Sequence, residues 1–223
     1  MESPPQTDDS HAGQAVYSPL TLRIYDLLVL GISNSFIWKC PTRHILALYN
    51  RHLSSDHLDI GVGTGWFLDH AHFPAPGPRV ALLDLNAHSL AASSARIARY
   101  RPEQYQADIL KPLPFTTAPF RSISMTYLLH CLAGPWARKA FAFDNAMRLM
   151  HPDGVVFGAT LLSHGVARST AAKKLMSIYN GKGIFGNEAD DLDGLRRELE
   201  RRFEQVSIDI EGCAALFSAR GPR

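Results

Sequence analysis

A short apolar strand that runs into a glycine-rich turn constrains this chain more than any other feature. Residues 58–65 read Leu-Asp-Ile-Gly-Val-Gly-Thr-Gly. Gly61, Gly63 and Gly65 carry no Cβ, so a ligand can approach their backbone closely. A helix that follows such a turn offers unpaired N–H groups, which bind anionic or nucleotide-like groups. Three glycines alone are equally typical of a tight turn, so the flanking sequence has to decide between the two.

A carboxylate downstream of the turn favours a nucleoside ligand. Residues 80–85, Val-Ala-Leu-Leu-Asp-Leu, predict a second buried strand that ends near Asp84. An acid about twenty residues after the glycines can accept hydrogen bonds from both ribose hydroxyls of a nucleoside. The dinucleotide fingerprint requires Gly or Ala three places after Gly63, where this chain has Trp66. The two features together predict a nucleoside cofactor other than NAD.

The spacing Asp59-x-Gly61-x-Gly63-x-Gly65 resembles motif I of class I S-adenosylmethionine (SAM)-dependent methyltransferases. The resemblance continues over most of the chain, where strand and helix patterns alternate and a hairpin closes the sequence. It implies an α/β fold with a doubly wound, seven-stranded, mostly parallel Rossmann-like sheet and a helical N-terminal cap. It also implies that SAM is the cofactor and that the binding residues include Asp59, Gly61, Gly63, Gly65, Asp84, Leu85 and Asn86.

Further cofactor contacts follow from the same resemblance. A third strand is predicted over residues 104–109, and by analogy Asp108 accepts a hydrogen bond from the adenine amino group while Ile109 lies against the ring. Thr126 ends the predicted fourth strand. The segment ahead of motif I commonly folds over the cofactor in this family, although aromatic residues there are equally well explained as core. The lid candidates are Tyr25, Trp38 and Arg43.

Two residues after the fourth strand are the catalytic candidates. By the family pattern this strand ends beside the methyl group, and His130 and Tyr127 stand there. Methyl transfer is an in-line displacement that needs mainly alignment. A phenol, enol or acid is nearly ionised already, whereas a neutral hydroxyl or an ammonium needs a base such as histidine. His130 is therefore predicted to be a base or a substrate-orienting group, or else merely a cap of residues 129–132. Tyr127 is predicted to orient a substrate.

Several substrate classes are disfavoured. The Asn/Asp-Pro-Pro-Tyr motif of nucleobase and glutamine methyltransferases is absent at residues 126–129, and residues 128–133 and 161–165 lack the carboxylates of the metal-dependent catechol type. A formal charge of +2 gives no basic bias toward nucleic acid. We therefore expect metal-free methylation of an O or N atom on a small, fairly hydrophobic metabolite, as in natural-product tailoring enzymes.

The chain length of 223 residues predicts one domain. We expect a disordered tail at 1–15 and a methyltransferase domain at 16–223, with a helical lid at 16–53 and a cap insertion at 161–188. The N-terminus lacks a secretory pattern, the 3 cysteines are dispersed, and no long apolar run occurs. These features predict a cytoplasmic protein that does not enter a membrane, is a monomer or homodimer, and has a small-molecule acceptor as its partner.

Local patterns predict the remaining elements. Helices are expected at 42–52 and, unbroken, at 136–150, with a turn at 151–154 before a fifth strand. Asp190, Asp191 and Asp193 are typical of a helix N-terminus and are expected to form a solvated face.

Two other functions remain open. One is a cyclase or pericyclic catalyst of the same fold that uses bound SAM only as a charge or scaffold. The other is a non-catalytic binding protein, which the retention of the three glycines and Asp84 disfavours.

Overall fold

The structure, a computed structural model, describes residues 33–223, so Tyr25 and the predicted tail lie outside the described residues. Its helices are α2 (Thr42–His52), α3 (Trp66–His70), α4 (Ala87–Arg96), η4 (Ala98–Tyr100), η5 (Leu129–Cys131), α5 (Trp136–Lys139), α6 (Phe141–Leu149), α7 (Thr170–Gly181) and α8 (Leu192–Glu200). Its strands are β1 (Asp56–Ile60), β2 (Arg79–Asp84), β3 (Glu103–Gln106), β4 (Phe120–Thr126), β5 (Met150–Leu161), β6 (Phe203–Glu211) and β7 (Ala214–Pro222).

The strands form one sheet with the order β3-β2-β1-β4-β5-β7-β6. Strands β1 to β5 are mutually parallel, and β7 runs antiparallel to both β5 and β6. The chain first winds outward from β1 to β3 and then returns to place β4 on the other side of β1. In doubly wound sheets ligands bind at such a reversal, outside the carboxyl ends of the strands, which here are the ends of β1 and β4. The predicted doubly wound, mostly parallel sheet is confirmed.

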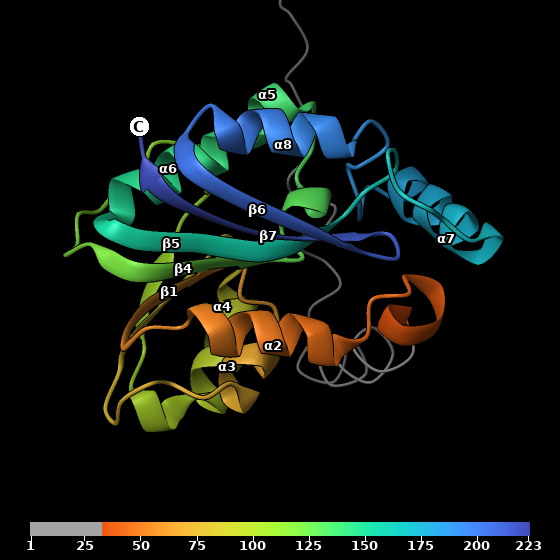
Figure 1. The fold of residues 1–223 in the computed structure, drawn as a ribbon. Coiled ribbons are helices and arrows are strands. Elements are labelled where there is room, and N and C mark those ends of the chain that lie inside the picture. The colour runs from red at the N-terminus through yellow and green to blue at the C-terminus, as the bar shows by residue number, and fades with distance from the viewer. Residues whose placement is uncertain (1–32) are drawn as a thin grey trace, which may run out of the picture.

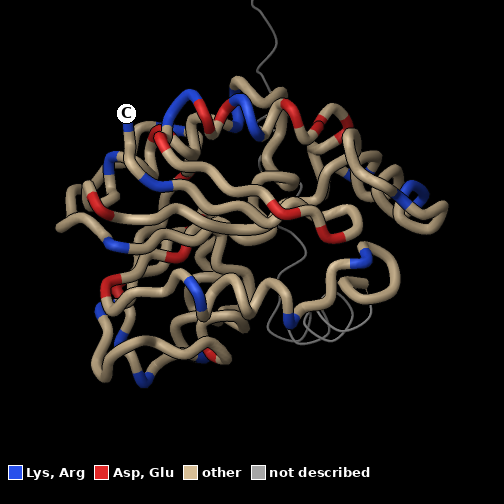
Figure 2. Tube along the Cα trace, viewed as in Figure 1, with Lys and Arg blue, Asp and Glu red and all other residues tan. Residues whose placement is uncertain are grey.

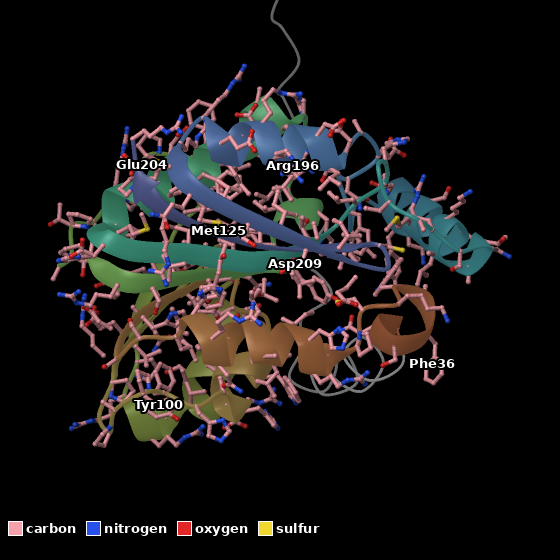
Figure 3. The ribbon with its side chains drawn as sticks, viewed as in Figure 1. Phe36, Tyr100, Met125, Arg196, Glu204 and Asp209 are labelled. Atoms are coloured by element: carbon pink, nitrogen blue, oxygen red, sulfur yellow. The ribbon has the colours of Figure 1, made fainter. Side chains whose placement is uncertain are left out.

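Helices cover both faces of the sheet (Figure 1). Helices α2, α3 and α4 lie on one face and α5, α6 and α8 on the other, while α7 stands beyond the sheet. Successive residues of a strand pack into two different apolar cores, one on each face of the sheet. In β2, Leu83 belongs to one core and Leu82 to the other. Met125 of β4 is fully buried between the layers (Figure 3). Among residues 33–223, no helix combines the length and the apolar character needed to cross a membrane.

Two predicted elements differ from the structure. The expected helix at 136–150 is broken at Ala140, which ends α5 and precedes α6. The bend contains no Gly or Pro and directly follows Lys139, whose side chain is fully buried. Strand β5 begins at Met150, and the turn predicted at 151–154 is an irregularity in its ladder: Phe120 pairs with Met150, but Ser122 pairs with Val155.

Candidate functional site

The glycine turn after β1 has three glycines in the left-handed region, with φ of +75° at Gly61, +52° at Gly63 and +72° at Gly65. A Cβ on Gly61 would lie 2.9 Å from Cδ1 of Leu128, and one on Gly65 would lie 3.0 Å from the backbone of Ser93. A Cβ on Gly63 would meet nothing within 4 Å. The outer glycines thus allow close packing, and the middle one leaves open backbone for a ligand to approach.

Asp84 ends β2 and faces this turn. Its Oδ1 accepts a hydrogen bond from the backbone N–H of Asn86 at 2.8 Å. Burial raises the pKa of Asp84 to about 6, although backbone N–H groups of Asn86, Val62 and Gly63 act to lower it. Burial outweighs these donors, and two further donors from ribose hydroxyls would favour the ionised carboxylate. Asn86 itself caps α4 by accepting the N–H of His88 at 2.8 Å, and Leu85 beside it is half-buried.

Asp59 lies in β1, directly before the same turn, where it is 4% exposed. Its Oδ1 accepts the hydroxyl of Tyr49 at 3.2 Å and a short hydrogen bond from Ser124 of β4. Ser124 also contacts Nε2 of His57 at 3.0 Å, while Nδ1 of that ring lies 2.8 Å from Ser122. This buried network joins β1, β4 and α2. Sequence reasoning missed Tyr49 and His57, whose only signal was polarity within apolar segments.

Tyr127 directly follows β4 and has φ of +59°, which is strained for a residue with a side chain. Its backbone N–H donates to the carbonyl of Ala159, and its hydroxyl donates to Oδ1 of Asn34 at 2.9 Å. Asn34 is fully buried and donates in turn to Oγ1 of Thr42 at 2.9 Å. Tyr127 therefore connects the carboxyl end of β4 to the segment before α2. Asn34 was also missed from the sequence.

His130 lies in η5 and is 3% exposed. Its Nδ1 accepts the backbone N–H of Leu161 at 3.3 Å and lies 3.5 Å from Oγ1 of Thr160. Burial, followed by the charge of Lys139, lowers the pKa of His130 to about 3. The ring of Tyr127 packs edge-on against it at 5.4 Å. The structure thus brings both predicted catalytic residues together beside the glycine turn, which Leu128 contacts.

Comparison with known proteins decides the family. Residues 58–156 match a family described as a methyltransferase domain. A physcion biosynthesis cluster O-methyltransferase of Aspergillus chevalieri is 38% identical over 221 residues, covering 98% of this chain and 99% of that protein. The chain belongs to the class I methyltransferase family.

Other relatives of the methyltransferase agree. A demethylluteothin O-methyltransferase of Streptomyces thioluteus is 39% identical over 207 residues, covering 93% of this chain and 90% of that protein. The solved DhpI complex with SAH (S-adenosylhomocysteine) has a TM-score of 0.69 at 18% identity, covering 96% of this chain and 97% of that chain. The fold matches, and the sequence prediction of a SAM-dependent small-molecule methyltransferase is confirmed.

An aromatic cluster in the methyltransferase surrounds His130. Phe185 places its ring centroid 4.6 Å from that of His130, 5.0 Å from that of Tyr179 and 6.2 Å from that of Trp38. Trp38 is 2% exposed, whereas Tyr179 and Phe185 are half-buried. The cluster joins the segment before α2, the loop after β4 and the segment around α7. Phe185 was missed because its partners are distant in sequence.

Some predicted site residues stand apart from this cluster. Arg43 is exposed on α2. Asp108 is half-buried after β3 and forms a local turn, in which its Oδ1 accepts the N–H of Leu110 at 2.9 Å. Ile109 is buried, and its carbonyl accepts the side-chain amide of Asn145 at 2.7 Å. Thr126 is buried at the end of β4.

The prediction that the acids before α8 form a solvated face is wrong for Asp190. Acidic and basic residues are interspersed along α8 itself (Figure 2). Asp190, however, is 1% exposed and accepts the Nζ of Lys139, which is 0% exposed, at 2.5 and 2.7 Å. Lys139 also donates to the carbonyl of Gly186 at 2.9 Å. The buried ammonium group of Lys139 therefore explains how the carboxylate of Asp190 can be buried.

Replacing Tyr49 with phenylalanine should destabilise the methyltransferase by about 2 kcal/mol, because buried Asp59 then loses a hydroxyl donor. Burial raises the pKa of Asp59 to about 6, so the folded protein favours the protonated carboxyl. This form stabilises the fold fully below about pH 4, and the stabilisation is lost as the pH rises through 6. Without the Tyr49 donor that loss grows. Denaturant unfolding should thus show a larger deficit at about pH 8 than at about pH 5.

The half-buried Tyr179, whose hydroxyl makes no hydrogen bond to the residues described, supplies the matched control. Tyr179→Phe should change the free energy of unfolding by less than about 0.5 kcal/mol at both pH values. A Tyr49→Phe deficit that is constant across pH would contradict the coupling to Asp59.

Proposed function

We propose that the methyltransferase binds SAM along the glycine turn and transfers its methyl group to an oxygen of a small acceptor held beside Tyr127 and His130. The open backbone at Gly63, whose N–H faces the carboxylate of Asp84, carries the proposal for the cofactor. The O-methyltransferase relatives that span nearly the whole chain support oxygen as the atom methylated.

In this proposal Asp84 accepts the ribose hydroxyls, and Leu85 and Asn86 border the nucleoside. Asp108 accepts the adenine amino group, with Ile109 against the ring. Gly61, Gly63 and Gly65 admit the methionine part, Asp59 and Thr126 support it from β1 and β4, and Trp38 closes over it. Arg43, exposed on α2, would join only if the lid brought its guanidinium inward.

Catalysis in this site rests on alignment. Bound SAM supplies an electrophilic methyl group on a sulfonium. Tyr127 is held in its strained conformation by Asn34 and by the carbonyl of Ala159, so its ring and backbone fix the floor of the acceptor site. The aromatic cluster around Phe185 would exclude water and hold the acceptor in line with the carbon–sulfur bond.

Binding of SAH should weaken as the pH falls below 6. The pKa of Asp84 is about 6 in the free protein, and hydroxyl donors favour its ionised form. Protonation therefore opposes binding, and the dissociation constant should rise by up to about tenfold for each pH unit below 6. Calorimetric titration of SAH between about pH 5 and 8 measures this, with NADH as a ligand that should give no heat.

The variant Asp209→Asn is the matched control, because Asp209 is an exposed acid on β6, away from β1 and β2 (Figure 3). It should leave the pH dependence unchanged. An SAH affinity that is flat from pH 5 to 8 would contradict the role of Asp84. Mass spectrometry of products then tests the reaction: a 14-Da gain by the acceptor together with SAH indicates methylation, whereas turnover without SAH would indicate the cyclase type of chemistry.

A further inference from the structure

The hydrogen bonds of His130 fix which of its nitrogens carries the proton. The backbone N–H of Leu161 can only donate, and it points at Nδ1 of His130 at 3.3 Å. Nδ1 therefore carries a lone pair, and the proton of the neutral ring is on Nε2. Nε2 has no hydrogen-bond partner among residues 33–223, although the residue is 97% buried. The Nε2–H group of His130 is therefore a hydrogen-bond donor whose acceptor must be a bound ligand.

The surroundings of the imidazole oppose a proton on Nδ1. Protonation would set two N–H donors, those of His130 and Leu161, against each other. The titratable groups around the ring are Tyr127, which donates to Asn34; Cys131, which donates its thiol to the Tyr127 carbonyl; and the Lys139–Asp190 pair behind. The charge of Lys139 adds to burial in lowering the pKa of His130. None of these groups is placed to take a proton from an acceptor near neutral pH.

Aromatic rings lie on several sides of His130. Phe185 and Tyr127 pack edge-on to the imidazole, and Tyr179 packs edge-on to Phe185. These rings come from the loop after β4 and from α7 with the residues after it. Flat aromatic molecules gain most from such surroundings, because ring pairs add to simple burial of area.

We infer that the acceptor is a planar aromatic compound whose hydroxyl ionises without help from the protein, and that His130 donates Nε2–H to its oxygen anion instead of acting as a base. The inference rests on the proposed function and names its substrate class. The acceptor loses its proton to solvent before the reaction. An electron pair of the oxygen anion then forms the new O–CH₃ bond while the CH₃–S bond breaks, leaving a neutral ether and the neutral thioether of SAH.

Four bicyclic aromatic alcohols of similar size separate acidity from shape: 4-hydroxycoumarin, 7-hydroxycoumarin, 2-naphthol and 2-naphthylmethanol, in order of decreasing acidity. Their kcat/KM should be measured against pH at saturating SAM. We expect the pH of half-maximal kcat/KM to rise along the first three in the order of their own pKa values. The fourth, which does not ionise, should not be methylated.

Variants of His130 test its role as a donor. Gln keeps an N–H donor but cannot act as a base, whereas Leu has neither property. Against 4-hydroxycoumarin, His130→Leu should lose about a hundredfold in kcat/KM and His130→Gln at most about tenfold. Both should keep the wild-type pH profile.

The outcomes separate cleanly. One pH midpoint shared by all acceptors, methylation of 2-naphthylmethanol, or equal losses in the Gln and Leu variants would overturn the inference. Failure to methylate any of the four by a protein that still binds SAH would also overturn it. Absence of SAH binding would instead remove the proposed function on which it rests.

Discussion

Replacing Asp84 with asparagine should weaken SAH binding by about two orders of magnitude. The loss follows from two charge-assisted hydrogen bonds to ribose hydroxyls becoming neutral ones, at about 1.5 kcal/mol each. The fold should not suffer, because the amide oxygen can still accept the N–H of Asn86. The half-buried carboxylate also opposes folding above its raised pKa, so the variant should unfold at an equal or higher temperature near pH 7.

The Asp84→Asn variant should bind SAH more weakly and yet be at least as stable as the wild type, so weak binding cannot be attributed to misfolding. Titration calorimetry gives the affinity and a thermal melt gives the stability. Asp209→Asn should change neither, since Asp209 is exposed on β6. Wild-type affinity in Asp84→Asn would remove Asp84 from the cofactor site, and a lower melting temperature would show that the carboxylate has a structural role.

The variant Lys139→Met should lower the free energy of unfolding by about 3–5 kcal/mol. It leaves the carboxylate of Asp190 buried without its cation, and such charges are costly inside proteins. The carbonyl of Gly186 loses its donor as well. Adding Asp190→Leu to this variant should recover a large part of the loss, because an apolar pair of similar volume carries no unpaired charge.

Chemical denaturation of the single and double variants measures the effect. Arg196→Met is the matched control: Arg196 pairs with Glu200 at 3.9 Å on the outer face of α8 and is half-exposed (Figure 3). Its loss should cost less than about 1 kcal/mol. A Lys139→Met variant no less stable than this control would mean that the interior solvates Asp190 by other means.

Most of the fold was predictable because its signals are local. The glycine turn, the acid at the end of β2 and the bounds of α2 follow from residues adjacent in sequence. The burial of Asp190 was not predictable, since it depends on a contact between residues 139 and 190 that no local pattern encodes. The break at Ala140 was missed because no Gly or Pro marks it. An acid next to a helix start is far more often solvated.

The residues of the candidate site likewise include some that a local pattern predicts and others that it does not. Gly63 and Asp84 are recognisable from spacing alone. Asn34, which holds Tyr127 from 93 residues away, and Phe185, which packs on His130, become neighbours only through the tertiary fold. The tautomer of His130 depends on the backbone of Leu161, so residue type alone left open whether the ring is a base or a donor.

The two ends of the segment that carries Tyr179 and Phe185 lie side by side. The N–H groups of Ser163 and His164 both donate to the carbonyl of Asp190, at 2.8 and 3.0 Å, and His164 forms a bridge with Asp191. Between these ends the segment is held again at Gly186, whose N–H donates to the carbonyl of His130 at 2.8 Å and whose carbonyl accepts the Nζ of Lys139 at 2.9 Å. A change of length between residue 165 and this second attachment therefore adds little loop-closure entropy, whereas a change at Gly186 would disturb η5 and α5 together.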